Sequence, residues 1–164
     1  MSRSLGKELP DTLRDALLNT VPSDIAVLLI TSSGFPHVSM LSWGELFLAN
    51  AGTLRLALWP GSTATKNLTG NSSAALTTVL GGSNYTVAFS ARRRADLDLP
   101  GAGKLACFDG HVEDVREDTV GYAVITSGIR FTLNDPESVA RKWQEKRAAL
   151  STMGDANNDG WTTY

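Results

Sequence analysis

A strand-to-helix turn carries the residue types best suited to bind an anion. The apolar stretch 54–59 stops at Pro60 and Gly61, and a short helix is expected to follow. The first residues of that helix carry hydroxyls and an ammonium: Ser62, Thr63, Thr65 and Lys66. Because the first turn of a helix presents unpaired N–H groups and the positive end of a dipole, this combination favours binding of a phosphate. An ordinary helix cap, with Ser62 as the N-cap and Lys66 in solvent, explains the same residues and stays open at this point.

The other candidate side chains form no catalytic group that the sequence identifies. His37 and His111 lie far apart and lack acidic neighbours at ligand spacing, so no metal site is expected. Residues 155–159 resemble the start of a calcium loop, but the glutamate that closes such a loop does not follow at the required position in this sequence. Cys107 lies in an apolar segment and is expected to be an inert core thiol. We therefore assign no catalytic side chain and no metal ligand.

Composition and charge narrow the class of protein. The chain has 164 residues, of which 42% are hydrophobic and 20% charged, as in a globular domain. A net charge of −2 predicts no nucleic-acid partner and no binding to an anionic membrane surface. The single cysteine excludes an internal disulfide, the N-terminus has no apolar signal core, and the apolar run 25–30 is too short to span a bilayer. These features predict a cytoplasmic protein.

Apolar periodicity predicts a mainly β domain with a few short helices. Strands are expected at 25–31, 37–43, 54–59, 73–80, 85–90, 104–116 and 122–133, and helices at 11–19, 63–71 and about 135–150. Asp135 and Pro136 mark the start of the last helix. The stretch 91–103 is expected to be a loop, and Gly110 and Gly128 are expected to bend their strands.

Many strands with few helices favour a closed or nearly closed antiparallel barrel with helical caps. Neither an internal repeat nor a domain boundary is visible, so one domain over 1–164 is expected. Its parts would be an N-terminal helix within 1–24, a barrel over 25–133, and a C-terminal helix and arm over 134–164. The arm, from residue 154 onward, has no apolar periodicity. We expect it to be either an ordered extension or a frayed end.

Four segments match one family pattern by their order and spacing. They are Gly34-Phe-Pro36 with the strand 37–43, the strand-turn-helix 54–68, the segment 68–80 that starts a strand after Asn71, and Asp109-Gly-His-Val-Glu-Asp-Val115. Together these segments span roughly residues 25–116. In this respect the chain resembles the pyridoxamine 5′-phosphate oxidase-like family of FMN-binding split barrels.

The resemblance implies a split antiparallel β-barrel that forms a homodimer and binds FMN between its subunits. Ser39, Met40, Leu41 and Ser42 would line the flavin ring, partly through backbone groups. Trp59, Gly61 and Ser62 would follow the ribityl chain and phosphate, while Thr65 and Lys66 would hold the phosphate with help from Asn67. Trp43 and Trp59 would lie near the flavin, and the alternative that both are core tryptophans of the barrel stays open.

The chain departs from the family pattern at several positions. Oxidases of pyridoxamine phosphate place an arginine and a lysine on the second strand, where this chain offers Ser39 and Ser42. The arginine that commonly precedes the phosphate lysine is Thr65 here, and Ser72 stands in place of a proline. The arginine-rich C-terminal substrate segment is not visible. Oxidation of vitamin B6 is therefore not expected.

Several functions fit this resemblance. The first is an FMN-dependent oxidoreductase that acts on an unknown small substrate, with NAD(P)H as a candidate reductant. The second is a flavin-binding sensor or carrier without turnover. The third keeps the fold and replaces FMN by haem or a deazaflavin. The sequence does not name the substrate, because substrate groups in such barrels come from loops and termini.

Overall fold

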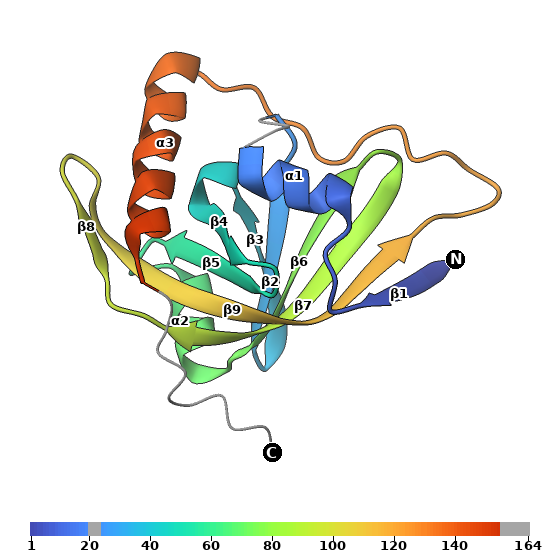
Figure 1. Ribbon diagram of the computed structural model, residues 1–164, viewed down its shortest axis with the longest axis horizontal. Helices are drawn as coiled ribbons and strands as arrows, with labels where there is room; N and C mark the ends of the chain where they lie inside the picture. Colours follow the sequence, from blue (N-terminus) through green and yellow to red (C-terminus); the bar gives the residue numbers. More distant parts are fainter. Residues whose placement is uncertain (20–23, 155–164) are drawn as a thin grey trace.

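The computed structural model describes residues 1–19 and 24–154, and its core is a curved antiparallel sheet (Figure 1). The C-terminal arm, apart from Gly154, lies outside the described residues. Within the described ranges the elements are β1 (Ser2–Gly6), α1 (Asp11–Asn19), β2 (Val27–Ser33), β3 (Phe35–Leu41), the 3-10 helix η1 (Trp43–Glu45), β4 (Leu46–Asn50), β5 (Thr53–Leu58), α2 (Thr63–Gly70), β6 (Ser73–Leu80), β7 (Ser83–Arg93), β8 (Leu97–Leu99), β9 (Gly103–Asp118) and α3 (Pro136–Thr152).

The sheet is organised around its longest strand, β9. The strand order is β3-β2-β6-β7-β9-β5-β4, and β1 and β8 also pair with β9. Residues at the centre of β9, such as Asp109, pair with β5 on one side and β7 on the other. The two ends of the order, β3 and β4, are consecutive in the chain and are joined through η1. This leaves the barrel open along the seam between β3 and β4.

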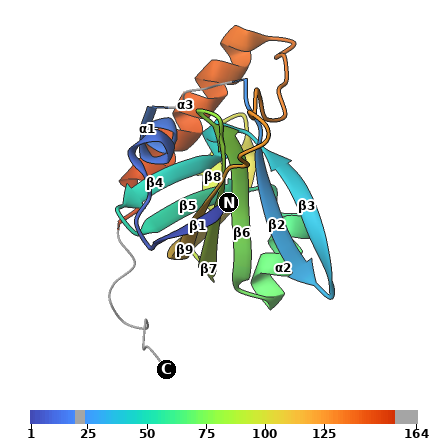
Figure 2. The same ribbon diagram turned by 90° about the vertical axis from the view of Figure 1, so that its right-hand side faces the viewer.

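Helices close the two ends of the barrel. Alternation along β5 turns Leu54, Leu56 and Leu58 toward the inside, where they join the main core. Leu13 and Leu17 of α1 enter that core from one end, and Ala64 and Leu68 of α2 enter it from the other. Figures 1 and 2 show the two helices at opposite ends of the sheet. The core thus extends through the barrel from one helix to the other.

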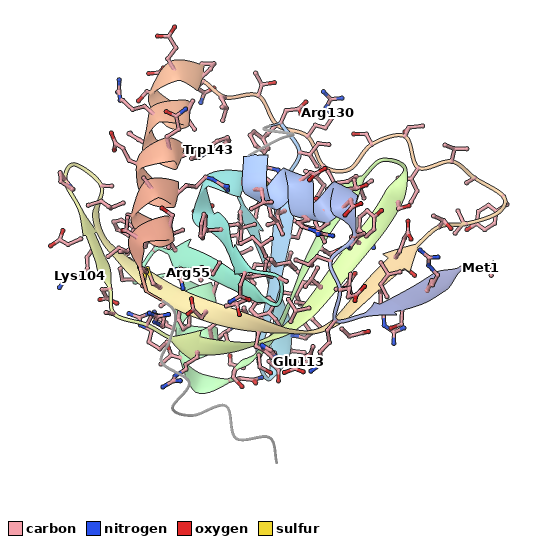
Figure 3. All side chains as sticks on the ribbon, viewed as in Figure 1. Met1, Arg55, Lys104, Glu113, Arg130 and Trp143 are labelled. Atoms are coloured by element: carbon pink, nitrogen blue, oxygen red, sulfur yellow. The ribbon has the colours of Figure 1, made fainter. Side chains whose placement is uncertain are left out.

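The third helix covers part of the outside. Ala57 of β5 and two residues of β9, Leu105 and Cys107, form a second apolar cluster with Leu150 of α3. Leu150 has no exposed surface. The C-terminal end of α3 is therefore packed against the outer face of β5 and β9 (Figure 3).

Most of the predicted elements are confirmed. The helix at 11–19 and the strand at 73–80 have the predicted bounds. The helix α3 begins as predicted, with Asp135 as the N-cap accepting a hydrogen bond from the backbone N–H of Ser138 at 3.2 Å. A mainly antiparallel β architecture with three α-helices in the described ranges agrees with the expected fold class.

Three predictions about the strands are wrong, and one strand was missed. The expected loop 91–103 contains the end of β7 and all of β8, because both pair with β9. The expected strand 122–133 is irregular and makes one isolated bridge, between Ile25 and Arg130. The bend or bulge expected at Gly110 is not found there, because the pairing of β7 with β9 is regular at Gly110. The register shifts between Ala88 and Phe89 instead. The strand β1 was not expected, because apart from the half-buried Leu5 its residues are polar or glycine and exposed, and it lies in the fold mainly through pairing with β9.

Gly110 has a packing role instead. A Cβ atom at this position would lie 2.6 Å from the ring of Phe89, which is closer than real contacts allow. The glycine therefore lets the Phe89 ring lie against the backbone of β9 inside the barrel.

Candidate functional site

The turn from β5 into α2 is a capped helix start. The Oγ atom of Ser62 accepts the backbone N–H of Thr65 at 3.1 Å and donates to Thr65 Oγ1 at 3.0 Å. The Thr65 hydroxyl in turn donates to the carbonyl oxygen of Trp59 at 2.8 Å. The cap interpretation is confirmed, and these two hydroxyls hold the turn in shape.

Asn67 fastens the same helix to the sheet. Its Nδ2 atom donates to Thr31 Oγ1 at 3.0 Å, and both side chains are buried. Thr31 lies on β2 opposite His37 of β3. The helix α2 packs against both of these strands. Asn67 therefore fixes α2 against β2, the strand that pairs with β3.

Lys66 is the group at this turn that is left available for a ligand. Its side chain is exposed, and it forms no ion pair or hydrogen bond within the described part of the chain. The backbone N–H groups of Thr63 and Ala64 also find no acceptor among the described residues. An ammonium and two free N–H groups at the positive end of a helix suit an anion. Trp59, which is 64% exposed, and the exposed Gly61 lie beside them.

The residues expected to line the flavin ring lie at an edge of the sheet. β3 pairs only with β2, and no strand in the described ranges pairs with its other edge (Figure 2). Alternation turns Ser39 and the buried Leu41 toward the inner face, whereas Met40, 59% exposed, points to the outer face. A single planar ligand beside β3 would therefore meet these residues mainly through the unpaired backbone edge.

Trp43 does not belong to this surface. It is fully buried in the main core, and its Nε1 atom donates to the carbonyl oxygen of Ile25 at 2.7 Å. The alternative of a core tryptophan is therefore the one that the structure shows, because core packing encloses the whole side chain.

A groove of about 340 Å³ opens where β3 ends. It is lined by Met40, Leu41, Ser42, Glu45, Phe131, Leu133, Val139 and Trp143. One wall thus comes from β3 and η1, and the other comes from α3 and the segment before it. The groove brings three of the expected ring residues together with side chains that lie about 90 or more positions later in the chain.

Glu45 is the acid of this groove and was missed from the sequence. Its Oε2 atom accepts the backbone N–H of Ser42 at 2.7 Å and the Ser42 hydroxyl at 3.1 Å. The Ser-x-x-Glu spacing was a visible signal for this arrangement. No comparable signal marks Phe131 and Leu133, which lie in the segment that was expected to be a strand.

Close packing fixes α3 over η1. A Cβ atom on Gly44 would lie 2.2 Å from the Cγ atom of Trp143, so the indole lies directly on the backbone of η1. Figure 3 shows Trp143 on the side of α3 that faces the sheet. One turn further along α3, Arg147 donates to the carbonyl oxygens of Leu46 at 2.9 Å and Leu17 at 2.7 Å. Burial lowers the pKa of the Arg147 guanidinium from its usual value.

The remaining candidates do not assemble into a second site. Burial raises the pKa of the Cys107 thiol, which suits a core residue. In the described part of the chain no three His, Cys, Asp or Glu side chains gather as metal ligands would. Residues 155–159, which resemble a calcium loop, lie outside the described residues. None of the described helices is both long and apolar enough to cross a membrane.

Comparison with known structures gives the same architecture. A pyridoxamine 5′-phosphate oxidase candidate from Lactobacillus delbrueckii superposes with a TM-score of 0.54 at 16% identity, covering 69% of this chain and 98% of that one. This is the split-barrel fold of pyridoxamine 5′-phosphate oxidase-like proteins. HupZ from Group A Streptococcus is a second similar split barrel, with a TM-score of 0.51 at 13% identity, covering 76% of this chain and 100% of that one. The expected fold class is thus confirmed.

Sequence comparison adds one relative. The uncharacterized protein YclD of Bacillus subtilis is 28% identical to this split barrel over 142 residues, which cover 86% of this chain and 92% of that protein. No family model matches the chain. The likeness to solved structures concerns the fold, so the function has to be argued from the site itself.

Proposed function

We propose that this split barrel binds FMN and acts as a flavin-dependent oxidoreductase on a small organic substrate. The observation that carries the proposal is the ammonium of Lys66 beside the first N–H groups of α2, all without a partner among the described residues, in a fold shared with oxidase-like proteins. The open edge of β3 and the groove beyond it supply the room for a ring system.

The phosphate would be held by Lys66 and by the N–H groups of Thr63 and Ala64. Charge-assisted hydrogen bonds of this kind are the strong ones, and the helix dipole adds to them. Trp59, Gly61 and Ser62 would follow the ribityl chain. Thr65 and Asn67 support the site indirectly, because their side chains already hold the turn and the helix.

The isoalloxazine ring would lie along the unpaired edge of β3, beside Ser39 to Ser42. Its pyrimidine end carries hydrogen-bond donors and acceptors that suit exposed backbone N–H and C=O groups. FMN itself supplies the hydride or electron chemistry, whereas the protein supplies position and polarity. Chemistry carried by FMN needs no nucleophilic side chain, and we assign none.

A homodimer is part of the proposal. Val38 and Met40 on the outer face of β3 are 55% and 59% exposed, and their neighbours on β2, Leu28 and Ile30, are half-buried. Exposed apolar side chains that adjoin one another mark a surface that another chain covers. A second copy on this face would also close the flavin site along β3.

The absorption spectrum of the purified protein tests the function directly. Bound FMN gives flavin bands, and added NAD(P)H should bleach them without oxygen if a nicotinamide is the reductant. Flavin bands that no reductant or substrate changes would favour a sensor or carrier. A Soret band would show that the protein binds haem and not FMN, and a deazaflavin spectrum would show that it binds a deazaflavin. A colourless protein that does not bind added FMN would overturn the proposal.

A further inference from the structure

The groove at the end of β3 has the size and lining of a small-molecule site. Its volume of about 340 Å³ lies within the range of roughly 300–1,000 Å³ that is typical of ligand pockets. Apolar and aromatic side chains form most of its surface. The aromatic ones are Phe131, which is half-buried, and Trp143, which packs on Gly44 and is 8% exposed. Ser42 and Glu45 are its polar members.

The charge of the groove comes from Glu45. Only its Oε2 atom is engaged, by the backbone N–H and the hydroxyl of Ser42. The other carboxylate oxygen, Oε1, takes no hydrogen bond, and no cation pairs with Glu45, among the residues that the structure describes. A carboxylate with a spare acceptor beside aromatic walls selects a ligand with a positive charge or a strong N–H donor.

We infer that this groove binds the organic substrate, and that the substrate is a small aromatic molecule with a positively charged amine. The ring would pack between Phe131 and Trp143, and the ammonium would donate to Glu45 Oε1. Met40 and Leu41 belong both to the groove and to β3, the strand along which the flavin is proposed to lie. That the ligand is a substrate rests on the proposed function. That the groove binds it does not.

Binding is tested on the protein without flavin, by following backbone amide shifts in NMR titrations. The probes are phenethylammonium, its neutral analogue phenethyl alcohol, and phenylacetate, which carries the opposite charge. Phenethylammonium should shift the amides of residues 40–45 and 131–143 and bind tightest of the three. Equal affinities for the cation and the anion, or no shift in the groove with any probe, would overturn the inference.

Two variants separate charge from shape. Glu45→Gln keeps an acceptor for Ser42 and removes the charge, so it should weaken phenethylammonium at least about tenfold and leave phenethyl alcohol unchanged. Val139→Phe fills the groove from α3, so it should abolish binding of every probe while its melting temperature stays close to that of the original protein. If Glu45→Gln fails to fold, Val139→Phe decides, and probe binding that survives the filled groove would contradict the inference.

The same samples distinguish this inference from the proposed function. Lys66→Ala should leave the probe affinities unchanged, because Lys66 does not line the groove. If FMN fails to bind but phenethylammonium binds as described, the cation site stands and the oxidoreductase proposal falls. If FMN binds and the probes do not, the reverse conclusion follows.

Discussion

Arg55 and Asp109 form an ion pair that is almost completely removed from solvent. The Nε atom of Arg55 lies 2.7 Å from Asp109 Oδ1, and their side chains are 2% and 3% exposed. Arg55 also donates at 2.8 Å to the carbonyl oxygens of Leu150 and Met153, at the end of α3. Arg94 forms a second ion pair with Asp109. This cluster holds the end of α3 against β5 and β9, and thereby supports the helix that forms one wall of the groove.

Removing the carboxylate of Asp109 should destabilise the protein strongly. In Asp109→Ala, Arg55 stays buried without a counter-charge, and breaking one side of such a pair costs about 3–5 kcal/mol. Chemical denaturation measures the loss. The exposed pair of Arg93 and Asp96 is the matched control, because Asp96→Ala should cost no more than about 1 kcal/mol. Similar losses in the two variants would mean that the buried cluster does not hold α3 as described.

The phosphate role of Lys66 has a selective readout. Lys66→Ala should weaken FMN by at least about tenfold, or 1.4 kcal/mol, because one charge-assisted contact is lost. Riboflavin, which lacks the phosphate, should bind nearly as before. Flavin fluorescence titrations measure both affinities, and Lys142→Ala on the exposed side of α3 serves as the control. Equal losses for the two ligands would show that Lys66 does not contact the phosphate.

The close approach of Gly44 and Trp143 predicts an intolerant position. A methyl group on Gly44 would overlap the indole ring, and overpacking of this kind costs about 1–3 kcal/mol or more. Gly44→Ala should therefore lower the free energy of unfolding and loosen the groove wall. A Cβ atom on Gly70, at the end of α2, would meet no other atom within 4 Å, so Gly70→Ala should be neutral or stabilising by up to about 1 kcal/mol. Thermal denaturation of both variants checks the contrast.

The dimer proposal predicts that the outer face of β3 controls association. A charge at Val38 would have to be buried in the interface, so Val38→Asp should shift the protein from dimer to monomer in analytical ultracentrifugation. Val124, which is 84% exposed in the segment before α3, is the control, and Val124→Asp should leave the mass unchanged. A protein that is monomeric before any substitution would remove the dimer from the proposal.

Glu117 predicts an acid-dependent part of the stability. A hydrogen bond from the Ser83 hydroxyl lowers the pKa of Glu117 from its usual value, with further contributions from Tyr85 and Arg3. Because the folded-state pKa is the lower one, this stabilisation is present above the usual glutamate value of about 4.3 and is lost as the pH falls through the folded-state pKa.

The variant Glu117→Gln should accordingly be less stable than the original protein at neutral pH. Its deficit should shrink as the pH falls below about 4.3. Melting temperatures over that pH range measure the effect. Glu8→Gln replaces an exposed carboxylate that forms no hydrogen bond or ion pair among the described residues, and it should show no such deficit at either end of the range. A deficit for Glu117→Gln that stays constant with pH would contradict the assignment.

The amino-acid sequence determined the local elements and the chemical character of the β5–α2 turn. Apolar alternation predicted most strands, and the Ser62 and Asp135 caps marked two helix starts, because both signals act between residues close in the chain. The ordered motifs from Gly34 to Val115 were sufficient to predict the split barrel. Lys66 was predicted as an anion ligand from the same local pattern, and that role stays a prediction.

Only the tertiary structure decided which of these residues are free to act. Thr65 and Asn67 have the right chemistry for a ligand, but their side chains are engaged by Trp59 and Thr31. In the case of Asn67 the partner lies 36 positions earlier in the chain, on β2. Exposed strands such as β1 were missed for a related reason, since pairing with β9 and not apolar periodicity holds them in place. The groove forms because Trp143 of α3 packs on Gly44 of η1, about 100 positions earlier in the chain, and such long-range contacts arise from packing that no short sequence pattern encodes.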